Sequence, residues 1–220
     1  MLYDIKNNKT ISTIGHDLCD KRFSPCSTFK IFNCLVGLDT SVLKNEKSTK
    51  KWNGFTYPIP RWNKDQSLKS AIKNSVVWYF KEVAKDIGSN RMQSYLDHVG
   101  YGNQDISSGI TNFWLDRGSL KISVSETLEF MKKLYKKELP FGNYAISTTQ
   151  SLIIIEKNNE FTFSGKTGSG KDHGWFVGHL LSPKGEYVFA THISGNQASG
   201  NKAKEITKNI LRNLKIADLF

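Results

Sequence analysis

The chain has little cysteine and no long apolar run. Its 220 residues include three cysteines, at positions 19, 26 and 34. An odd count without CxxC or metal-ligand spacing predicts free thiols and implies neither a disulfide framework nor a metal site. No apolar segment approaches the roughly 18 residues of a membrane span, and no signal peptide is visible. We therefore expect either a cytosolic protein or one whose export signal or anchor lies outside this sequence.

Arginine is also scarce, although the chain is basic. Lysine and arginine total 31 against 20 acidic residues, a formal charge of +11, but only five are arginines. The lysines are scattered through segments such as KNNK, KSTKK, KKLYKK and NKAKEITK, and no basic block alternates with aromatic residues. Nucleic-acid sites concentrate their basic side chains on one face or stripe. We interpret this pattern as a solvated lysine-rich surface and expect no nucleic-acid partner.

Hydrophobic residues make up 38% of the chain and aromatic residues 12%, which is typical of a globular domain large enough for a proper core. Strand patterns lie at both ends of the sequence: a hairpin in LYDIKNNKTISTIG, then strands over 160–168, 173–182 and 186–194. We predict an α/β (α+β) fold that forms one domain over residues 1–220. In it, helices flank an antiparallel sheet from both termini (1–22 and 161–220), and a mainly helical subdomain covers 23–160.

The middle of the chain carries helix signals with clear ends. Ser24 followed by Pro25 predicts an N-cap and a first helical residue, and Ser123 with Glu126 predicts a capping box. The expected helices cover residues 25–38, 67–88, 89–100 and about 123–138, with the segment 149–158 closing the helical part and an amphipathic helix over 201–216. Turn residues predict a loop over 101–123.

One segment raises a chemical question, RFSPCSTFKIF. Ser27 and Lys30 stand one turn apart on a helix that is apolar almost all round. A lysine in the first turn of a buried helix opposes the helix dipole and loses its hydration. The alternative is a lysine that reaches solvent beside an incidental serine. The motif by itself leaves both interpretations open.

Three further segments carry similar groups. NSVVWYF places Ser75 inside an apolar helix, where its hydroxyl could also bond its own backbone. SGKTGSG places Lys166, Thr167 and Gly168 at the end of a strand, where a lysine could also mark a sheet edge. YGN, Tyr101 to Asn103, follows a helix end and could be a simple turn.

Along the chain, the Ser-x-x-Lys motif at Ser27, the Ser-x-Val motif at Ser75 and the Lys-Thr-Gly motif at Lys166 follow in an order that resembles the penicillin-recognising serine enzymes. With YGN and FWLDRGSLKIS between them, the chain resembles a class D (oxacillinase-type) β-lactamase from Tyr3 to Leu214. The resemblance implies hydrolysis of a small-molecule β-lactam antibiotic through an acyl-serine intermediate, without a metal. It also implies a bacterial protein that is secreted, periplasmic or anchored at the outer-membrane surface. The sequence leaves the oligomeric state and the preferred β-lactam open.

The resemblance assigns catalytic roles to five residues. Ser27 is the expected nucleophile, and burial should lower the pKa of Lys30 and leave a neutral amine. The family implies that CO2 or bicarbonate converts Lys30 to N6-carboxylysine, the general base, and that no other cofactor is needed. Trp114 is the expected hydrogen-bond donor to that carbamate, although it could equally be a core aromatic. Ser75 would relay a proton to the lactam nitrogen, and Lys166 would keep that relay electropositive.

Further residues are expected to hold the substrate. Phe29 and Val77 would wall the carbamate pocket, Thr167 would help hold the substrate carboxylate, and the N–H groups of Ser27 and Ser169 would form the oxyanion hole. The complete expected substrate-binding set is Val77, Tyr101, Asn103, Thr167, Gly168 and Ser169. Many class D enzymes grip the carboxylate with an arginine past the last strand, but HISGNQASGNKAKE has none. Lys202 or Lys204 could substitute without the bidentate fork.

The main alternative is a sensor. The extracellular sensor domains of membrane β-lactam receptors share the expected fold, and they stay acylated instead of turning over. Those receptors usually carry Asn at the third position of the Ser-x-x motif, where this chain has Val77. That valine, together with FWLDRGSLKIS and KLYKKELPF, favours the enzyme. A transpeptidase or carboxypeptidase is less favoured, because it lacks the apolar carbamate pocket, and so is an inactive binding module, because every reactive group is present.

Overall fold

The computed structural model describes residues 1–216, and its central element is one antiparallel sheet. The strands follow the order β2-β1-β8-β7-β6-β5, so the N-terminal hairpin pairs with the last strand of the chain. This confirms the predicted sheet built from both termini. The strands are β1 (Leu2–Asp4), β2 (Lys9–Ser12), β5 (Ile154–Lys157), β6 (Thr162–Gly170), β7 (His173–Ser182) and β8 (Gly185–Ser194).

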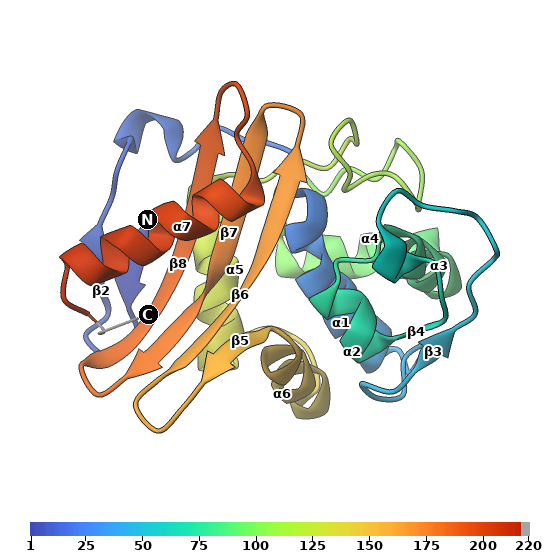
Figure 1. Ribbon diagram of the computed structural model, residues 1–220, viewed down its shortest axis with the longest axis horizontal. Helices are drawn as coiled ribbons and strands as arrows, with labels where there is room; N and C mark the ends of the chain where they lie inside the picture. The colour runs from blue at the N-terminus through green and yellow to red at the C-terminus, as the bar shows by residue number, and fades with distance from the viewer. Residues whose placement is uncertain (217–220) are drawn as a thin grey trace.

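Helices cover both faces of this sheet. Helix α7 (Gly200–Asn213) lies across the face of the sheet turned to the viewer in Figure 1. Helix α5 (Val124–Lys136) packs on the opposite face, against β7 and β8. The aromatic side chains of Phe163, Phe176 and Phe189 fill the space under α7. Ser123 caps α5 through the predicted capping box with Glu126.

The remaining helices stand beside the sheet (Figure 1). Helix α1 (Lys30–Asp39) runs through the centre of this part, is buried from Lys30 to Leu38, and packs against α3 and α6. The elements around it are η2 (Cys26–Phe29), η3 (Pro60–Trp62), α2 (Leu68–Lys73), α3 (Val77–Ile87), α4 (Ser89–Val99), α6 (Asn143–Leu152) and the small ribbon of β3 (Thr49–Lys50) and β4 (Gln66–Ser67). The short turn η1 (His16–Leu18) lies apart from them, after the N-terminal hairpin. Among residues 1–216, no helix is both long and apolar enough to cross a membrane.

The start of the first long helix differs from the prediction. The turn Cys26–Phe29 is a 3₁₀ helix, and the α-helix begins only at Lys30. Ser24 is not an N-cap, because its hydroxyl donates to the backbone oxygen of Asp116 at 2.7 Å. Cys26 has a φ of 51°, a left-handed conformation that no α-helix accommodates. Ser27 therefore lies in this 3₁₀ turn, before α1 begins.

Two other predicted helices are also wrong in part. The segment 67–88 is two helices, since α2 ends at Lys73 and α3 begins at Val77. Ser75 lies in the turn between them with a φ of 55°, so it is not inside a helix. In the segment 149–158, α6 ends at Leu152 and the apolar run continues as strand β5, which pairs with β6. A short apolar run fits a strand as well as a buried helix, so periodicity alone did not separate them.

Candidate active site

Ser27 lies on a turn that a neighbouring strand holds in place. Its neighbours Cys26 and Thr28 are buried, whereas Ser27 itself is only partly covered. Gly168 of β6 packs against this turn so closely that a Cβ atom there would lie 2.8 Å from the backbone oxygen of Pro25. Only glycine allows the two backbones to approach in this way. The fold therefore brings the Lys-Thr-Gly strand and the Ser-x-x-Lys turn into direct contact.

Lys30 is completely buried, with 0% of its surface exposed, and its amine faces two serines. The Nζ atom lies 2.6 Å from Ser27 Oγ and 3.3 Å from Ser75 Oγ. On another side, Nζ lies 5.7 Å from the centre of the Phe80 ring of α3. Lys30 does not reach solvent, which excludes the interpretation of an incidental serine beside an exposed lysine.

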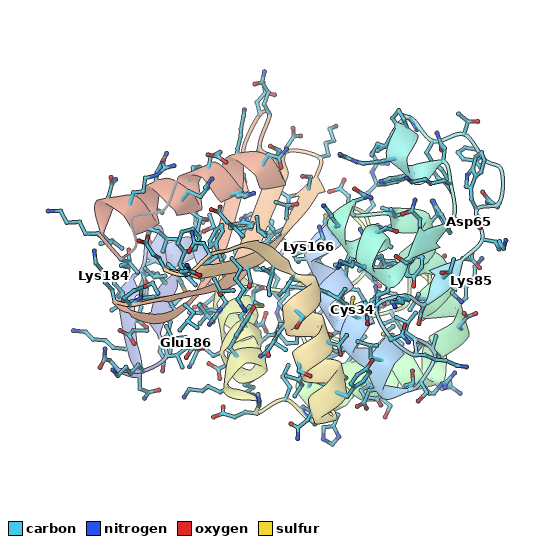
Figure 2. The ribbon with its side chains drawn as sticks, turned by 60° about the horizontal axis from the view of Figure 1, so that its bottom comes forward. Cys34, Asp65, Lys85, Lys166, Lys184 and Glu186 are labelled. Carbon is cyan, nitrogen blue, oxygen red and sulfur yellow. The ribbon has the colours of Figure 1, made fainter. Side chains whose placement is uncertain are left out.

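Lys166 approaches the same serines from the sheet. Figure 2 shows it between the sheet and the helical part of the molecule. Its Nζ atom donates to Ser75 Oγ at 3.0 Å and to the backbone oxygen of Thr167 at 2.9 Å. Ser75 is therefore within hydrogen-bond distance of both buried lysines. The left-handed turn at Ser75 directs the hydroxyl to them rather than to its own helix.

Burial changes the acid–base properties of both lysines. Loss of hydration, followed by the nearby charge of Lys166, holds the pKa of Lys30 well below its usual value. Loss of hydration also lowers the pKa of Lys166, to about 8. Lys30 is thus the group that gives up its proton first. A neutral amine beside a serine hydroxyl can act as a base or react with an electrophile.

The indole N–H of Trp114 is a buried hydrogen-bond donor near the start of α1. Its indole is fully buried and stacks on Phe29, the residue before Lys30, with 5.6 Å between the ring centres. Among the described residues, the Nε1 atom of Trp114 has no hydrogen-bond partner. A buried N–H group without a partner costs free energy, so its position points to an acceptor that the polypeptide does not provide.

Two expected substrate-binding residues lie in supporting positions. Tyr101 is buried among the rings of Phe29, Phe32 and Phe130. The side chain of Asn103 holds the following loop, because it donates to the backbone oxygen of Ser119 and accepts from the N–H of Lys121. These contacts do not place Tyr101 or Asn103 beside the serine–lysine cluster. The prediction that the two residues contact the substrate therefore stays a prediction.

The end of β6 meets the start of α7. A Cβ atom on Gly200 would lie 2.8 Å from the Cβ of Thr167, and Ser169 Oγ accepts from the N–H of Gly200 at 2.9 Å. Thr167 is partly exposed and Ser169 is exposed beside this contact, which leaves both open to a ligand. The amine of Lys202 donates to the side-chain oxygen of Gln197 at 3.3 Å.

Sequence reasoning missed Phe80 as a wall of the lysine pocket. It predicted Val77, which is only partly buried and begins α3. Phe80 follows Val77 by three residues and so shares its face of the helix, which is the spacing that could have identified it. The predicted wall residue Phe29 is fully buried and stacks on Trp114, as described above.

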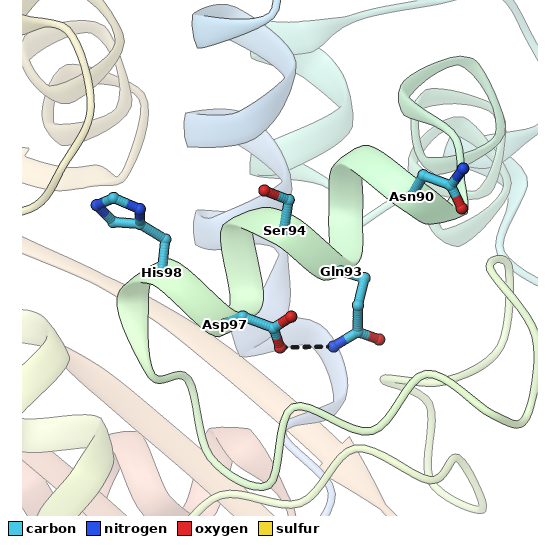
Figure 3. Close-up of a pocket in the computed structure, with 5 residues that line it drawn as sticks. All are labelled: Asn90, Gln93, Ser94, Asp97 and His98. Carbon is cyan, nitrogen blue, oxygen red and sulfur yellow. Dashed lines mark hydrogen bonds between the residues drawn. The ribbon is translucent and has the colours of Figure 1, made fainter.

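Two other concave regions lie apart from this cluster. One is a hollow on α4 lined by Asn90, Gln93, Ser94, Asp97 and His98 (Figure 3). All five residues come from a single helix, and a hydrogen bond between Gln93 and Asp97 occupies two of them. The other is an apolar cavity of about 540 Å³ between the N-terminal segment, β8 and α7. No member of the serine–lysine cluster lines either region.

Comparison with known proteins agrees with this geometry. The family model for the penicillin binding protein transpeptidase domain matches residues 2–212. "Probable beta-lactamase YbxI" of Bacillus subtilis (strain 168) is 39% identical over 215 residues, which cover 96% of this chain and 79% of that protein. "Regulatory protein BlaR1" of Bacillus licheniformis is 37% identical over 211 residues, which cover 93% of this chain and 35% of the receptor. The chain thus spans about a third of the length of BlaR1.

Solved structures give the same two kinds of relative. The crystal structure of a class D β-lactamase from Bacillus subtilis superposes with a TM-score of 0.94 at 38% identity, covering 99% of this chain and 91% of that one. The C-terminal domain of the Bacillus licheniformis BlaR penicillin-receptor gives a TM-score of 0.91 at 36% identity, covering 98% and 89%. The chain therefore belongs to the penicillin-binding protein transpeptidase domain family, within a group of relatives that includes class D β-lactamases and penicillin receptors.

Proposed function

We propose that this protein hydrolyses β-lactam antibiotics through an acyl-enzyme on Ser27. The observation that carries the proposal is the fully buried amine of Lys30, 2.6 Å from Ser27 Oγ. An ordinary serine hydroxyl needs an adjacent base to become a nucleophile, and a buried lysine with a lowered pKa supplies one. We place the protein outside the cytoplasm, as a secreted, periplasmic or anchored protein.

Acylation uses the two serines and the two lysines together. Ser27 Oγ attacks the lactam carbonyl carbon while its proton passes to the base at Lys30. The C–N bond of the lactam then breaks, and Ser75 delivers a proton to the leaving nitrogen. Lys166, 3.0 Å from Ser75 Oγ, stabilises the negative charge that develops along this relay. The N–H groups of Ser27 and Ser169 are the proposed oxyanion hole.

We further propose that Lys30 is carboxylated on Nζ. Its neutral amine forms an N–C bond with CO2 and releases one proton, which yields an anionic base where a cation is poorly tolerated. The chain fits this group at three points: the unpartnered Nε1 of Trp114 can donate to it, and Phe29 and Phe80 keep water out. For hydrolysis of the ester, a base at Lys30 takes a proton from the attacking water and Ser27 leaves.

The substrate carboxylate needs a different set of groups. Thr167, Ser169 and Lys166 are close together on β6, and they are the proposed anchors in the absence of an arginine. Gly168 allows the strand to reach Ser27, and Val77, Tyr101 and Asn103 complete the proposed substrate-binding set. Thr167 and Ser169 are hydrogen-bonding groups without charge, so we expect weaker selection for the carboxylate than an arginine would give.

A stably acylated sensor is the second candidate function. The observation that favours it is the similarity to BlaR1, which extends over 93% of this chain. A sensor needs acylation of Ser27 but no base that survives to activate water. The two functions therefore differ in the second half-reaction only.

Intact-mass spectrometry after one addition of benzylpenicillin tests the proposal. We expect a penicillin adduct that forms on the wild type and then disappears with bicarbonate present, while Ser27→Ala forms none. Ser108→Ala, which removes an exposed hydroxyl, is the matched control and should behave as the wild type. An adduct on Ser27→Ala would contradict the nucleophile. A wild-type adduct that persists for hours with bicarbonate supplied would favour the sensor.

A further inference from the structure

Three metal-ligating side chains meet directly behind the Ser27 turn. Cys26, Asp116 and His173 place one sulfur, one oxygen and one nitrogen atom within 4.8 Å of one another. They come from η2, from the loop after Trp114 and from the first residue of β7, so their sequence spacing gives no sign of the cluster. None of these side chains belongs to the acylation machinery described above.

The hydrogen bonds inside the cluster converge on a single atom. His173 Nε2 lies 3.0 Å from Asp116 Oδ1 and 3.8 Å from Cys26 Sγ. A nucleophilic triad would use both ring nitrogens, one for the carboxylate and the other for the thiol. Here one proton on Nε2 cannot serve both partners at once. A cation at the centre would satisfy all three atoms.

The two separations from His173 Nε2 are close to those in a tetrahedral transition-metal site. Zinc binds thiolate at about 2.3 Å and imidazole or carboxylate at about 2.0–2.2 Å, which separates two ligand atoms by roughly 3.3–3.6 Å. The observed separations from Nε2, 3.0 and 3.8 Å, need only small adjustments. The space is kept by Gly170, because a Cβ atom there would lie 2.0 Å from His173 Nε2 and 2.1 Å from Asp116 Oδ1.

Burial and charge also suit such an ion. Cys26 is 3% exposed and His173 is 8% exposed, whereas the Asp116 side chain is partly open to solvent. The open side leaves room for a water molecule as a fourth ligand. A thiolate and a carboxylate together balance the charge of a divalent cation. The N–H of Lys171 holds Asp116 Oδ1 at 3.0 Å, an outer contact of the kind that orients metal ligands.

We propose that Cys26, Asp116 and His173 form a site for a divalent transition metal of the zinc type. Binding replaces the thiol proton of Cys26 by the metal and releases that proton to solvent, with no change in oxidation state. The bound ion joins the turn before Ser27 to β7 and to the loop that carries Trp114. It is thus a clamp on the active-site framework, and it does not depend on whether the acyl-enzyme is hydrolysed.

The same strand offers a matched control. His179 of β7 also pairs with a carboxylate, with 2.8 Å between its Nε2 and Glu186 Oε1. No cysteine or second carboxylate completes a metal-ligating group there within the described part of the chain. Cys34 is a second control, because it is a buried free thiol without such partners.

Metal titration of the full chain tests the site. With Zn²⁺ competed against a chromophoric chelator, we expect one ion per chain in the wild type, and at least tenfold weaker binding in Cys26→Ser, Asp116→Asn and His173→Gln. With Co²⁺, the wild type should show a thiolate-to-metal charge-transfer band that Cys26→Ser lacks. His179→Gln and Cys34→Ser should retain both signals.

Far-UV circular dichroism identifies variants that fail to fold, and the remaining ligand variants then decide the question. If wild-type protein shows no charge-transfer band with Co²⁺, no thiolate binds metal and the proposal is wrong. It is also wrong if Zn²⁺ binds the folded ligand variants as tightly as it binds the two controls. A rise in the melting temperature with Zn²⁺ in the wild type, absent from His173→Gln, would support the clamp.

Discussion

Lys30 and Lys166 are both buried and both reach Ser75, but their surroundings differ. Lys30 begins α1, is 0% exposed and has an aromatic ring and two hydroxyls around its amine. Lys166 lies on β6, is 6% exposed and donates to a backbone oxygen as well as to Ser75. A carbonyl oxygen stabilises an ammonium group, whereas an aromatic wall and hydroxyls replace little of its hydration.

These surroundings suit the two lysines to different tasks. Lys166 keeps a pKa of about 8, so it remains largely a cation at neutral pH. Lys30, with its pKa held well below the usual value by burial and by the charge of Lys166, is the neutral partner. One lysine therefore makes the other easier to deprotonate. Four substitutions test this contrast between the two lysines.

Removing the amine of Lys30 should have the largest effect. Loss of a general base costs about 10²- to 10⁴-fold, so we expect Lys30→Ala to lose that much in the rate of β-lactam turnover. It should also lose the ¹³C NMR signal that labelled bicarbonate gives with the wild type. Lys121→Ala is the matched control, since Lys121 also donates to a serine, Ser24, at 2.6 Å. If the ¹³C signal persists in Lys30→Ala, another lysine is modified.

Giving Lys30 a polar neighbour should slow the second half-reaction. Asn in place of Val77 offers the free amine a hydrogen-bond partner, which makes the unmodified lysine competitive with the carbamate. We expect Val77→Asn to show a burst of acylation followed by deacylation about 10²-fold slower, the low end of the effect of losing a base. Stopped-flow hydrolysis of a chromogenic cephalosporin measures both phases. Val77→Thr, of similar shape, separates polarity from size, and equal steady-state rates for all three proteins would contradict this role.

Removing the indole donor of Trp114 should make activity depend on bicarbonate. A hydrogen bond to a charged group contributes about 1.5–3 kcal/mol, or roughly 10- to 100-fold in CO2 retention. Trp114→Phe keeps an aromatic ring against Phe29 but lacks the N–H. We expect its activity to be low without bicarbonate and to recover with it. The wild type should do the same only at mildly acidic pH, where the carbamate is lost. Bicarbonate-independent activity of the wild type at low pH would argue against a carbamate base.

The smallest effect concerns the charge of Lys166. Its pKa of about 8 means that the cation is present below pH 8 and is lost as the pH rises through that value. Acylation by the wild type should therefore fall above pH 8, by about half at the pKa. Arginine stays charged throughout this range, so Lys166→Arg should lack the alkaline limb even if its maximum is lower. If the acylation rate of Lys166→Arg falls above pH 8 as it does in the wild type, the titrating group is not Lys166.

The sequence was informative wherever a local rule decided the structure. The capping box of Ser123 and Glu126 and the end of α4 at Gly100 needed no tertiary information. The motifs containing Ser27, Ser75 and Lys166 also identified the groups that the fold brings together. Their order along the chain carried this information through the family resemblance, because each motif alone had an ordinary structural explanation.

Other features depended on contacts between distant segments. Ser24 has the local signature of a helix cap, but its polar groups bond to distant segments instead. Its hydroxyl donates to the backbone oxygen of Asp116 and accepts from the amine of Lys121, and its carbonyl oxygen accepts from the indole N–H of Trp175. The left-handed conformations of Cys26 and Ser75 cost free energy locally, and only the packed surroundings maintain them. No local pattern could predict such residues, since ordinary propensity argues against them. The partners of Cys26 were hidden for the same reason.

The pairing of β1 with β8 has a consequence for how the protein is made. The N-terminal amine of Met1 bonds the backbone oxygen of Ala190, 189 residues away. At about 5–20 residues per second, a ribosome completes that stretch in roughly 10–40 s. During this interval, the first hairpin has no neighbouring strand, and the central strands β7 and β8 do not yet exist. The six-stranded sheet therefore cannot form completely until the last quarter of this sequence has emerged.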